Sequence, residues 1–139
     1  MENKKCTAVQ YKVRYNECDP SGYAFNANFF IWMQEAVGQF ITALGIDVQK
    51  IALAQQTFMA VHLSCDYKRP VGVGDIIDVS PQVIELGESN FQTQYNIYKE
   101  GDLAAVGKTI HVFMDTREKK RLSLTDELRE KLESGVQSE

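Results

Sequence analysis

The chain has 139 residues, 44% hydrophobic and 24% charged, which is the ordinary balance of one soluble globular domain with a substantial core. Its net charge of −4 argues against a general nucleic-acid surface, so an anionic ligand would need a local basic patch. The three cysteines form no C-x-x-C pair, and the two histidines, His62 and His111, are isolated residues in strand-like segments. We therefore expect a single cytoplasmic domain over residues 1–139, with no metal, no cofactor, no nucleic acid and no membrane partner.

The first patterned segment is a strand over residues 7–15. Its apolar and aromatic side chains alternate with polar ones, which is the period of a half-buried strand; they are Val9, Tyr11, Val13 and Tyr15. Residues 16–22 then read NECDPSG, a run of turn-forming residues that ends the alternation.

A long helix is predicted over residues 28–44, because its few polar residues form one narrow stripe. The stripe consists of Glu35, Gly38, Gln39 and Thr42, with Gln34 beside it. A helix with so little polar surface must be covered on most sides, and Gly45 is a natural stop. A second, weaker helix is predicted over residues 48–55.

The remainder of the chain is predicted to be mostly strand. Segments 58–67, 75–86, 90–99 and 103–114 are joined by a Pro/Gly loop at 68–74 and by short turns at 87–89 and 100–102, which favours antiparallel hairpins. Pro81 marks a bulge or an edge position in the second of these strands. Thr125 can cap a short helix over residues 126–132.

These elements together predict an α+β fold in which one antiparallel sheet of about five strands curls around a single hydrophobic helix. Such a sheet hides the helix on most sides and keeps one face in contact with water.

The stretch between the first strand and the long helix carries a resemblance to a known family. Residues 15–33 read YNECDPSGYAFNANFFIWM. This resembles the active-site signature of hotdog-fold acyl-CoA thioesterases, above all the 4-hydroxybenzoyl-CoA thioesterase family, with its Cys-Asp-Pro-small-Gly form. The order of predicted elements matches the hotdog fold over nearly the whole chain.

The resemblance implies roles for several residues of this stretch. The family's catalytic carboxylate falls on Asp19, as nucleophile or as general base, and the thioester oxygen would face backbone N–H groups of Phe25 and Asn26. Free N–H groups at a helix N-terminus suit a developing oxyanion, and Gly22 lets the backbone approach the substrate closely. Many bacterial relatives carry a histidine at the position of Asn26, so a histidine-assisted mechanism from that position is excluded here.

The carboxylates of this region have alternative roles. In an Asp-Pro-Ser-Gly turn, Asp19 can simply bond its own loop backbone. Glu35 is the next candidate because some hotdog enzymes carry their carboxylate on the helix, although a solvated or interface role suits its place in the polar stripe better. Glu17 is interpreted as structural.

Coenzyme A carries phosphates, so cationic side chains are needed near the site. Two clusters are available: Lys68 and Arg69 before the Pro/Gly loop, and residues 117–121, which include Arg117 and Lys119. Arg69 is favoured because it precedes a proline at a loop edge. Tyr23 is a further substrate-binding candidate beside Gly22.

The sequence thus predicts an acyl-CoA thioesterase that hydrolyses an aryl or medium-chain thioester to the free acid and CoA. Relatives of this kind imply a homodimer or homotetramer with the site at the subunit boundary. Two alternatives remain: a non-catalytic acyl-CoA- or lipid-binding hotdog protein, and a thioesterase that serves an acyl-carrier protein through its basic 117–121 cluster.

Overall fold

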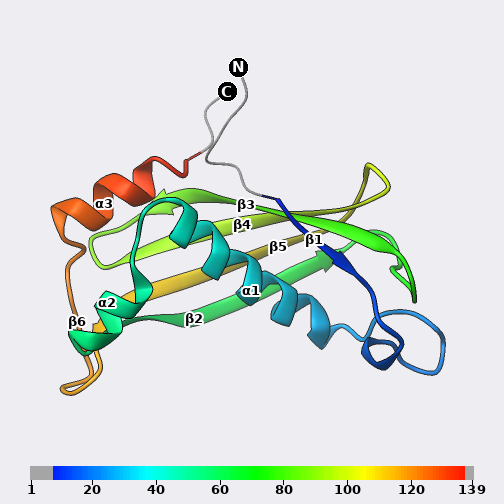
Figure 1. Ribbon diagram of the computed structural model, residues 1–139, viewed down its shortest axis with the longest axis horizontal. Helices are drawn as coiled ribbons and strands as arrows, with labels where there is room; N and C mark the ends of the chain where they lie inside the picture. The colour runs from blue at the N-terminus through cyan, green and yellow to red at the C-terminus, as the bar shows by residue number, and fades with distance from the viewer. Residues whose placement is uncertain (1–7, 137–139) are drawn as a thin grey trace.

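One antiparallel sheet curves around one long helix in the computed structural model, which describes residues 8–136 (Figure 1). The strands are β1 (Val9–Lys12), β2 (Gln56–Tyr67), β3 (Ile76–Leu86), β4 (Asn90–Lys99), β5 (Asp102–Asp115) and the short β6 (Lys120–Arg121). The helices are α1 (Ala27–Ala43), α2 (Val48–Leu53) and α3 (Asp126–Glu133), and a 3-10 turn covers Tyr15–Glu17. The predicted α+β architecture is confirmed.

The strands lie in the order β1-β3-β4-β5-β2, with β6 paired to β5, and every neighbouring pair is antiparallel. Strands β3, β4 and β5 follow one another through short turns, as predicted. The turn after β4 places Glu100 and Gly101 at φ values of 53° and 83°, the left-handed geometry that two-residue hairpins require.

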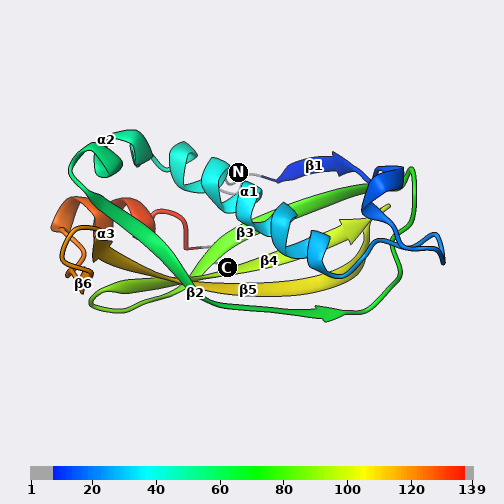
Figure 2. The same ribbon diagram turned by 90° about the horizontal axis from the view of Figure 1, so that it is seen from below.

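Helix α1 lies along the concave face of the sheet (Figure 2). Its inward side chains and the facing side chains of the sheet form one core; the fully covered ones include Met33, Ala36, Phe40, Ile77, Val79, Phe91 and Tyr95. The helix approaches β5 so closely that a Cβ added at Gly107 would overlap the Met33 sulfur. A larger residue at this position would require the Met33 side chain to move, so Gly107 favours the close crossing of the helix over β5.

Local sequence signals explain where the helices begin and end. Gly45 adopts a φ of 95° just after α1, the conformation that glycine tolerates best. The Asp47 carboxylate accepts the Lys50 N–H at the start of α2, and the Thr125 hydroxyl accepts the Leu128 N–H at the start of α3. The predicted Thr125 cap is confirmed.

The first strand is shorter than predicted. Of the nine residues expected, Thr7 lies outside the described residues and only Val9–Lys12 form β1. Tyr15 was expected on the buried face, which is wrong: it is 84% exposed, because the chain turns into the 3-10 turn at this point.

The two outer strands of the sheet differ. In the described part of the chain, β1 pairs with β3 from Ile76 to Val79, so Pro81 lies beyond this pairing on the outer side of the sheet. An edge position is one of the two that the sequence predicted for Pro81. Past Pro81, the Val83 N–H donates to the Gly135 carbonyl at 3.0 Å, so the segment after α3 covers this edge. Strand β2, by contrast, is twelve residues long and has one strand neighbour, β5, among the described residues.

Within residues 8–136, no helix combines the length and the apolar character needed to cross a membrane.

Candidate active site

A tight reversal between β1 and α1 carries Asp19. The backbone N–H of Asp19 donates to the Tyr23 carbonyl at 3.0 Å, and the Gly22 N–H donates to the Asp19 carbonyl at 2.9 Å. Gly22 has a φ of 91°, where a side chain would be strained. An isolated bridge between Cys18 and Ala24 closes the base of the reversal, so the loop returns directly to the start of α1.

The Asp19 carboxylate lies exposed at the tip of this reversal. Its Oδ1 accepts the Ser21 N–H at 2.9 Å and the Ser21 hydroxyl. These bonds stabilise the charged form and lower the pKa of Asp19 below its ordinary value, the Ser21 hydroxyl contributing most. Asp19 therefore bonds its own loop backbone, which is the alternative role that the sequence offered for it. The carboxylate that forms these bonds is ionised at neutral pH.

The buried Glu17 carboxylate ties the 3-10 turn to α1. Its oxygens accept the Arg14 N–H at 2.8 Å, the Arg14 guanidinium at 3.3 Å and the Trp32 indole N–H at 3.3 Å. Burial alone would raise the pKa of Glu17, but these donors outweigh it and leave the pKa below its ordinary value. The structural role predicted for Glu17 is confirmed.

The first turn of α1 offers two backbone donors toward the site. The expected pair was Phe25 and Asn26, but the Phe25 N–H is already bonded to the Glu17 carbonyl at 2.9 Å, so this part of the prediction needs correction. For Asn26 and Ala27 no acceptor lies within residues 8–136. These N–H groups, at the positive end of the helix, can stabilise an oxyanion. The general rule of free helix N-terminal donors could have identified Ala27 from the sequence.

A cavity of about 280 Å³ opens beside these donors and brings four predicted residues together. Tyr23, Asn26, Lys68 and Arg69 line it, with Ala24, Phe29, Tyr67, Pro70 and Val71. The loop at the end of β2 is held in place because the N–H groups of Lys68 and Arg69 both donate to the Ala104 carbonyl, at 2.8 and 3.0 Å. Neither cation has an ion-pair partner in the described part of the chain, so both can bind a ligand.

Tyr67 is a site residue that sequence reasoning missed. Its hydroxyl donates to the Asn26 carbonyl at 3.3 Å, and its ring packs edge-on against Phe29 with centroids 4.9 Å apart. The residue thus connects the end of β2 to the start of α1. Its place as the last strand residue before Lys68 was the available signal.

The profile of the thioesterase-like superfamily matches residues 13–132, which is most of the chain. The chain belongs to the thioesterase-like superfamily. Its hotdog architecture, with a curved sheet around one central helix, is the fold that the sequence predicted.

Relatives of this superfamily member align with about nine-tenths of the chain. The 1,4-dihydroxy-2-naphthoyl-CoA hydrolase of Synechococcus elongatus is 26% identical over 126 residues, covering 89% of this chain and 93% of the relative. In fold, the chain is similar to Slr0204, a 1,4-dihydroxy-2-naphthoyl-CoA thioesterase from Synechocystis, with a TM-score of 0.82 and 21% identity over 91% of this chain and 95% of the other. The gentisyl-coenzyme A thioesterase BH1999 gives a TM-score of 0.83 and 22% identity, over 91% of this chain and 99% of the other.

Other predicted residues of this thioesterase-like chain lie apart from the cavity. Glu35 is exposed and lies nine residues beyond Asn26 on α1, a rise of about 14 Å. The Glu35 carboxylate lies near Tyr11 instead. Burial contributes most, and the negative charge of Glu35 contributes next, to raising the pKa of Tyr11 to about 12. The carboxylate of Glu35 therefore does not join the amides at the helix start.

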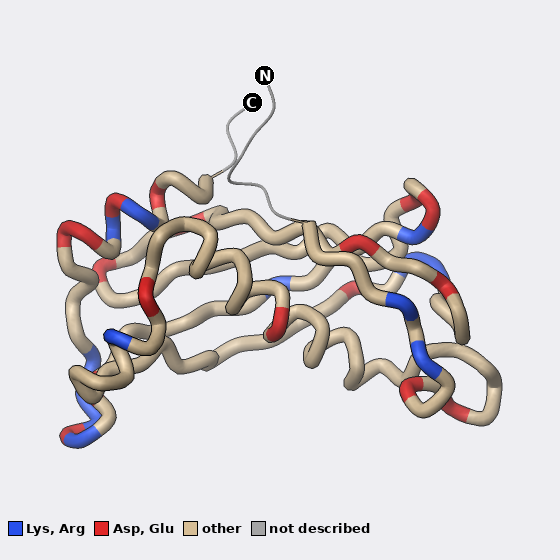
Figure 3. The backbone as a smooth tube through the Cα atoms, in the orientation of Figure 1, with Lys and Arg blue, Asp and Glu red and all other residues tan. Residues whose placement is uncertain are grey.

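Arg117 and Lys119 lie in the turn between β5 and β6, at the opposite end of the sheet from the start of α1 (Figure 1). Figure 3 shows the basic run at this hairpin, away from the Asp19 loop. The Thr116 N–H donates to the Gln55 carbonyl at 2.8 Å, which fixes the hairpin beside the N-terminal end of β2. Within one chain, the structure does not bring Arg117 and Lys119 together with Lys68 and Arg69.

Proposed function

We propose that this chain hydrolyses a thioester of coenzyme A to the free acid and CoA. The carrying observation is the first turn of α1, where the Asn26 and Ala27 N–H groups have no acceptor in the described chain and Asn26 lines a cavity, directly after the reversal that exposes the Asp19 carboxylate at its tip. A carboxylate and two oxyanion donors are the groups that acyl transfer to water requires. The superfamily and the names of the relatives support the same reaction.

Two routes use the same carboxylate. As a general base, Asp19 takes a proton from water while the water oxygen adds to the carbonyl carbon; the C–S bond then breaks, and the thiolate of CoA is protonated as it leaves. As a nucleophile, Asp19 adds to the carbonyl carbon itself and expels the thiolate, and water then hydrolyses the mixed anhydride and restores the carboxylate. In both routes, the Asn26 and Ala27 N–H groups donate to the carbonyl oxygen as its negative charge develops.

The working unit we propose is a pair of chains joined along β2. Among the described residues, this twelve-residue strand has no strand neighbour on its outer side, and it exposes Met59, Val61 and Leu63 at 48%, 55% and 46%. Long apolar edges of this kind favour pairing with another strand. Antiparallel pairing of β2 with its copy would bring the Tyr67 end of one chain to the Gln56 end of the other.

This pairing also gathers the basic residues. The 117–121 hairpin is bonded to Gln55, beside the N-terminal end of β2, whereas Lys68 and Arg69 follow its C-terminal end. Across a β2 pair, Arg117 and Lys119 of one chain would lie near Lys68 and Arg69 of the other. We propose that the two clusters together hold the phosphates of CoA.

The acyl group we propose is aromatic and hydroxylated. The relatives are named for dihydroxynaphthoyl-CoA and gentisyl-CoA, whose acyl groups are hydroxylated aromatic rings. A medium aliphatic chain is the competing class, so the substrate panel below contains both.

The test is CoA-thiol release from a panel of aryl and straight-chain acyl-CoAs, with Asp19→Asn as the variant and Glu35→Gln as the matched control. The change to Asn keeps size and polarity but removes the base, so kcat should fall at least ~10²-fold. Glu35→Gln should keep the wild-type rate. Wild-type rates in Asp19→Asn with a loss in Glu35→Gln would move the carboxylate to Glu35, and acyl-CoA binding without turnover by wild type would make the chain a binding protein.

A further inference from the structure

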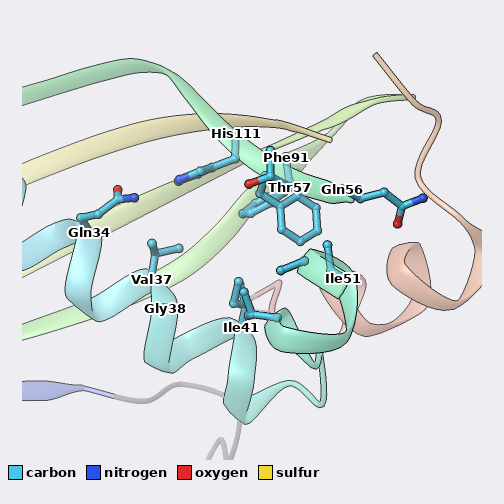
Figure 4. A pocket seen from close by; sticks show the side chains of 12 residues that line it. Gln34, Val37, Gly38, Ile41, Ile51, Gln56, Thr57, Phe91 and His111 are labelled. Carbon is cyan, nitrogen blue, oxygen red and sulfur yellow. The ribbon is translucent and has the colours of Figure 1, made fainter. Parts of the chain in front are cut away.

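A second cavity, of about 180 Å³, lies between α1, α2 and the sheet. Its walls are mainly apolar, as Figure 4 shows for the labelled residues, and they include Val37, Ile41, Ile51, Phe58 and Phe91. None of the side chains that line it, all within the described part of the chain, carries a charge at neutral pH. A cavity of this kind selects a neutral, largely apolar group.

One wall of this cavity contains a buried histidine, one of whose ring nitrogens has no hydrogen-bond partner in the described chain. His111 on β5 is 3% exposed, its ring stacks on Phe91 with centroids 5.2 Å apart, and its Nδ1 has no hydrogen-bond partner within residues 8–136. Burial lowers the pKa of His111 to about 4, so at neutral pH the ring is uncharged and offers one donor and one acceptor.

Gln34 and Thr57 add neutral polar side chains to the lining of the same cavity. Figure 4 shows the Gln34 amide, from α1, pointing toward the His111 ring, and Thr57 of β2 beside Phe91. Polar groups that converge in an apolar cavity fix the orientation of a ligand through hydrogen bonds. The arrangement suits a hydroxyl group, which can both donate and accept.

We infer that this cavity binds the hydroxyl-bearing aromatic ring of the acyl group, with His111 as the residue that selects the hydroxyl. The inference rests on the proposed thioesterase function and extends it to the substrate class. The size agrees, because an apolar cavity of about 150 Å³ accommodates benzene. The 180 Å³ observed here therefore holds one substituted ring.

The position of the cavity fits the proposed chain pair. Within one chain, Gln34 lies eight residues beyond Asn26, a rise of about 12 Å along α1, which is too far for a ring joined directly to the thioester carbonyl. The cavity borders Gln56 and Thr57 at one end of β2, whereas the Asn26 site borders Tyr67 at the other end. Antiparallel pairing of β2 places the two side by side, so a thioester held at Asn26 of one chain extends its ring into the His111 cavity of the other.

Binding is tested first, without turnover. The full wild-type chain, labelled with 15N in histidine, is titrated with phenol and with toluene as the matched probe without a hydroxyl. The chain has two histidines, and exposed His62 serves as the internal reference. We expect phenol to shift the His111 ring nitrogens several-fold more than toluene, because only phenol forms the hydrogen bond.

Selectivity is tested second, with benzoyl-CoA and hydroxybenzoyl-CoA. His111→Phe keeps the stacking on Phe91 and should lower kcat/KM for the hydroxylated thioester at least ~10-fold, with benzoyl-CoA changed less than ~3-fold. Thr93→Val is the matched control, since the Thr93 hydroxyl is also buried without a partner but lies outside the cavity. Thr57→Val provides a second test if His111→Phe does not fold.

The outcomes are distinguishable. Equal nitrogen shifts with phenol and toluene, or an equal loss on both thioesters in His111→Phe, would overturn the assignment of His111. A phenol-specific shift in a chain that hydrolyses no thioester would support the hydroxyl-binding cavity and refute the proposed function instead.

Discussion

Replacing Glu17 by Gln removes the charge that joins the 3-10 turn to α1 while it keeps the size of the side chain. The carboxylate accepts three hydrogen bonds, two from Arg14 and one from the Trp32 indole. A Gln side chain has one oxygen to accept with, and its NH₂ group would face an N–H donor. The variant should therefore lose stability although nothing is removed from the apolar core.

The magnitude follows from these contacts. The Arg14 guanidinium is 75% exposed on its side chain, so its ion pair with Glu17 contributes at most about 1 kcal/mol. Hydrogen bonds to a charged acceptor contribute about 1.5–3 kcal/mol each, and the buried Trp32 donor is the one that Gln cannot satisfy together with the Arg14 N–H. We expect Glu17→Gln to lower the free energy of unfolding by about 2 kcal/mol, which corresponds to a fall in Tm of about 5–10 °C for a chain of this size.

The loss should depend on pH in a defined direction. The folded-state pKa of Glu17 lies below its ordinary value of 4.5, so its stabilisation is fully present above pH 4.5 and is lost as the pH falls through the folded-state value. Wild type and Glu17→Gln should therefore differ most near neutral pH and converge in acid.

Urea unfolding followed by circular dichroism at one fixed protein concentration, at neutral pH and below pH 4.5, measures both effects. Glu118→Gln is the control, because Glu118 and its partner Lys120 are 67% and 73% exposed, and the change should stay within about 0.5 kcal/mol. A Glu17→Gln variant as stable as wild type at neutral pH would refute the reasoning. A loss that persists unchanged in acid would assign the effect to packing rather than to charge.

Two further predictions concern the site and its assembly. Ser21→Ala removes the hydroxyl that contributes most to the lowered pKa of Asp19, so the acidic limb of the kcat/KM–pH profile should move to higher pH; an unmoved limb would exclude Asp19 as the titrating group. Val61→Lys places a charge at the middle of the β2 edge, so light scattering should give the 15.8 kDa mass of one chain for this variant and twice that mass for wild type. Val73→Lys, at a position 50% exposed and outside β2, should leave the mass unchanged, and a single-chain mass in wild type would contradict pairing.

Periodicity in the sequence was sufficient to predict the main elements, because the apolar pattern of α1 and the alternation of β3–β5 are set by burial. Periodicity did not predict the two-residue β6 or the 3-10 turn at Tyr15–Glu17. Such short elements are defined by individual contacts, such as Arg14 with Glu17, and not by a repeating apolar pattern. For the site, the signature pointed to Tyr23 and Asn26 and the need for cations pointed to Lys68 and Arg69, and these four residues line one cavity.

The occupied Phe25 N–H, the contact of Tyr67 with Asn26 and the unpartnered His111 ring were not predictable. Each of these features depends on contacts that form only in the folded chain. No local pattern in a single sequence specifies such contacts.

The unequal outer strands of the sheet limit how large an assembly can grow. Beyond the four residues paired with β1, strand β3 has Pro81, which lacks an N–H, and its Val83 N–H is already taken by the Gly135 carbonyl. In the proposed pair the open strand β2 is consumed when two copies meet, and a third chain would find only the four described residues of β1 at the other side of the sheet. If the proposed β2 pair forms, strand addition would end after one step in a closed unit, which would protect the chain from polymerising into a continuous fibre.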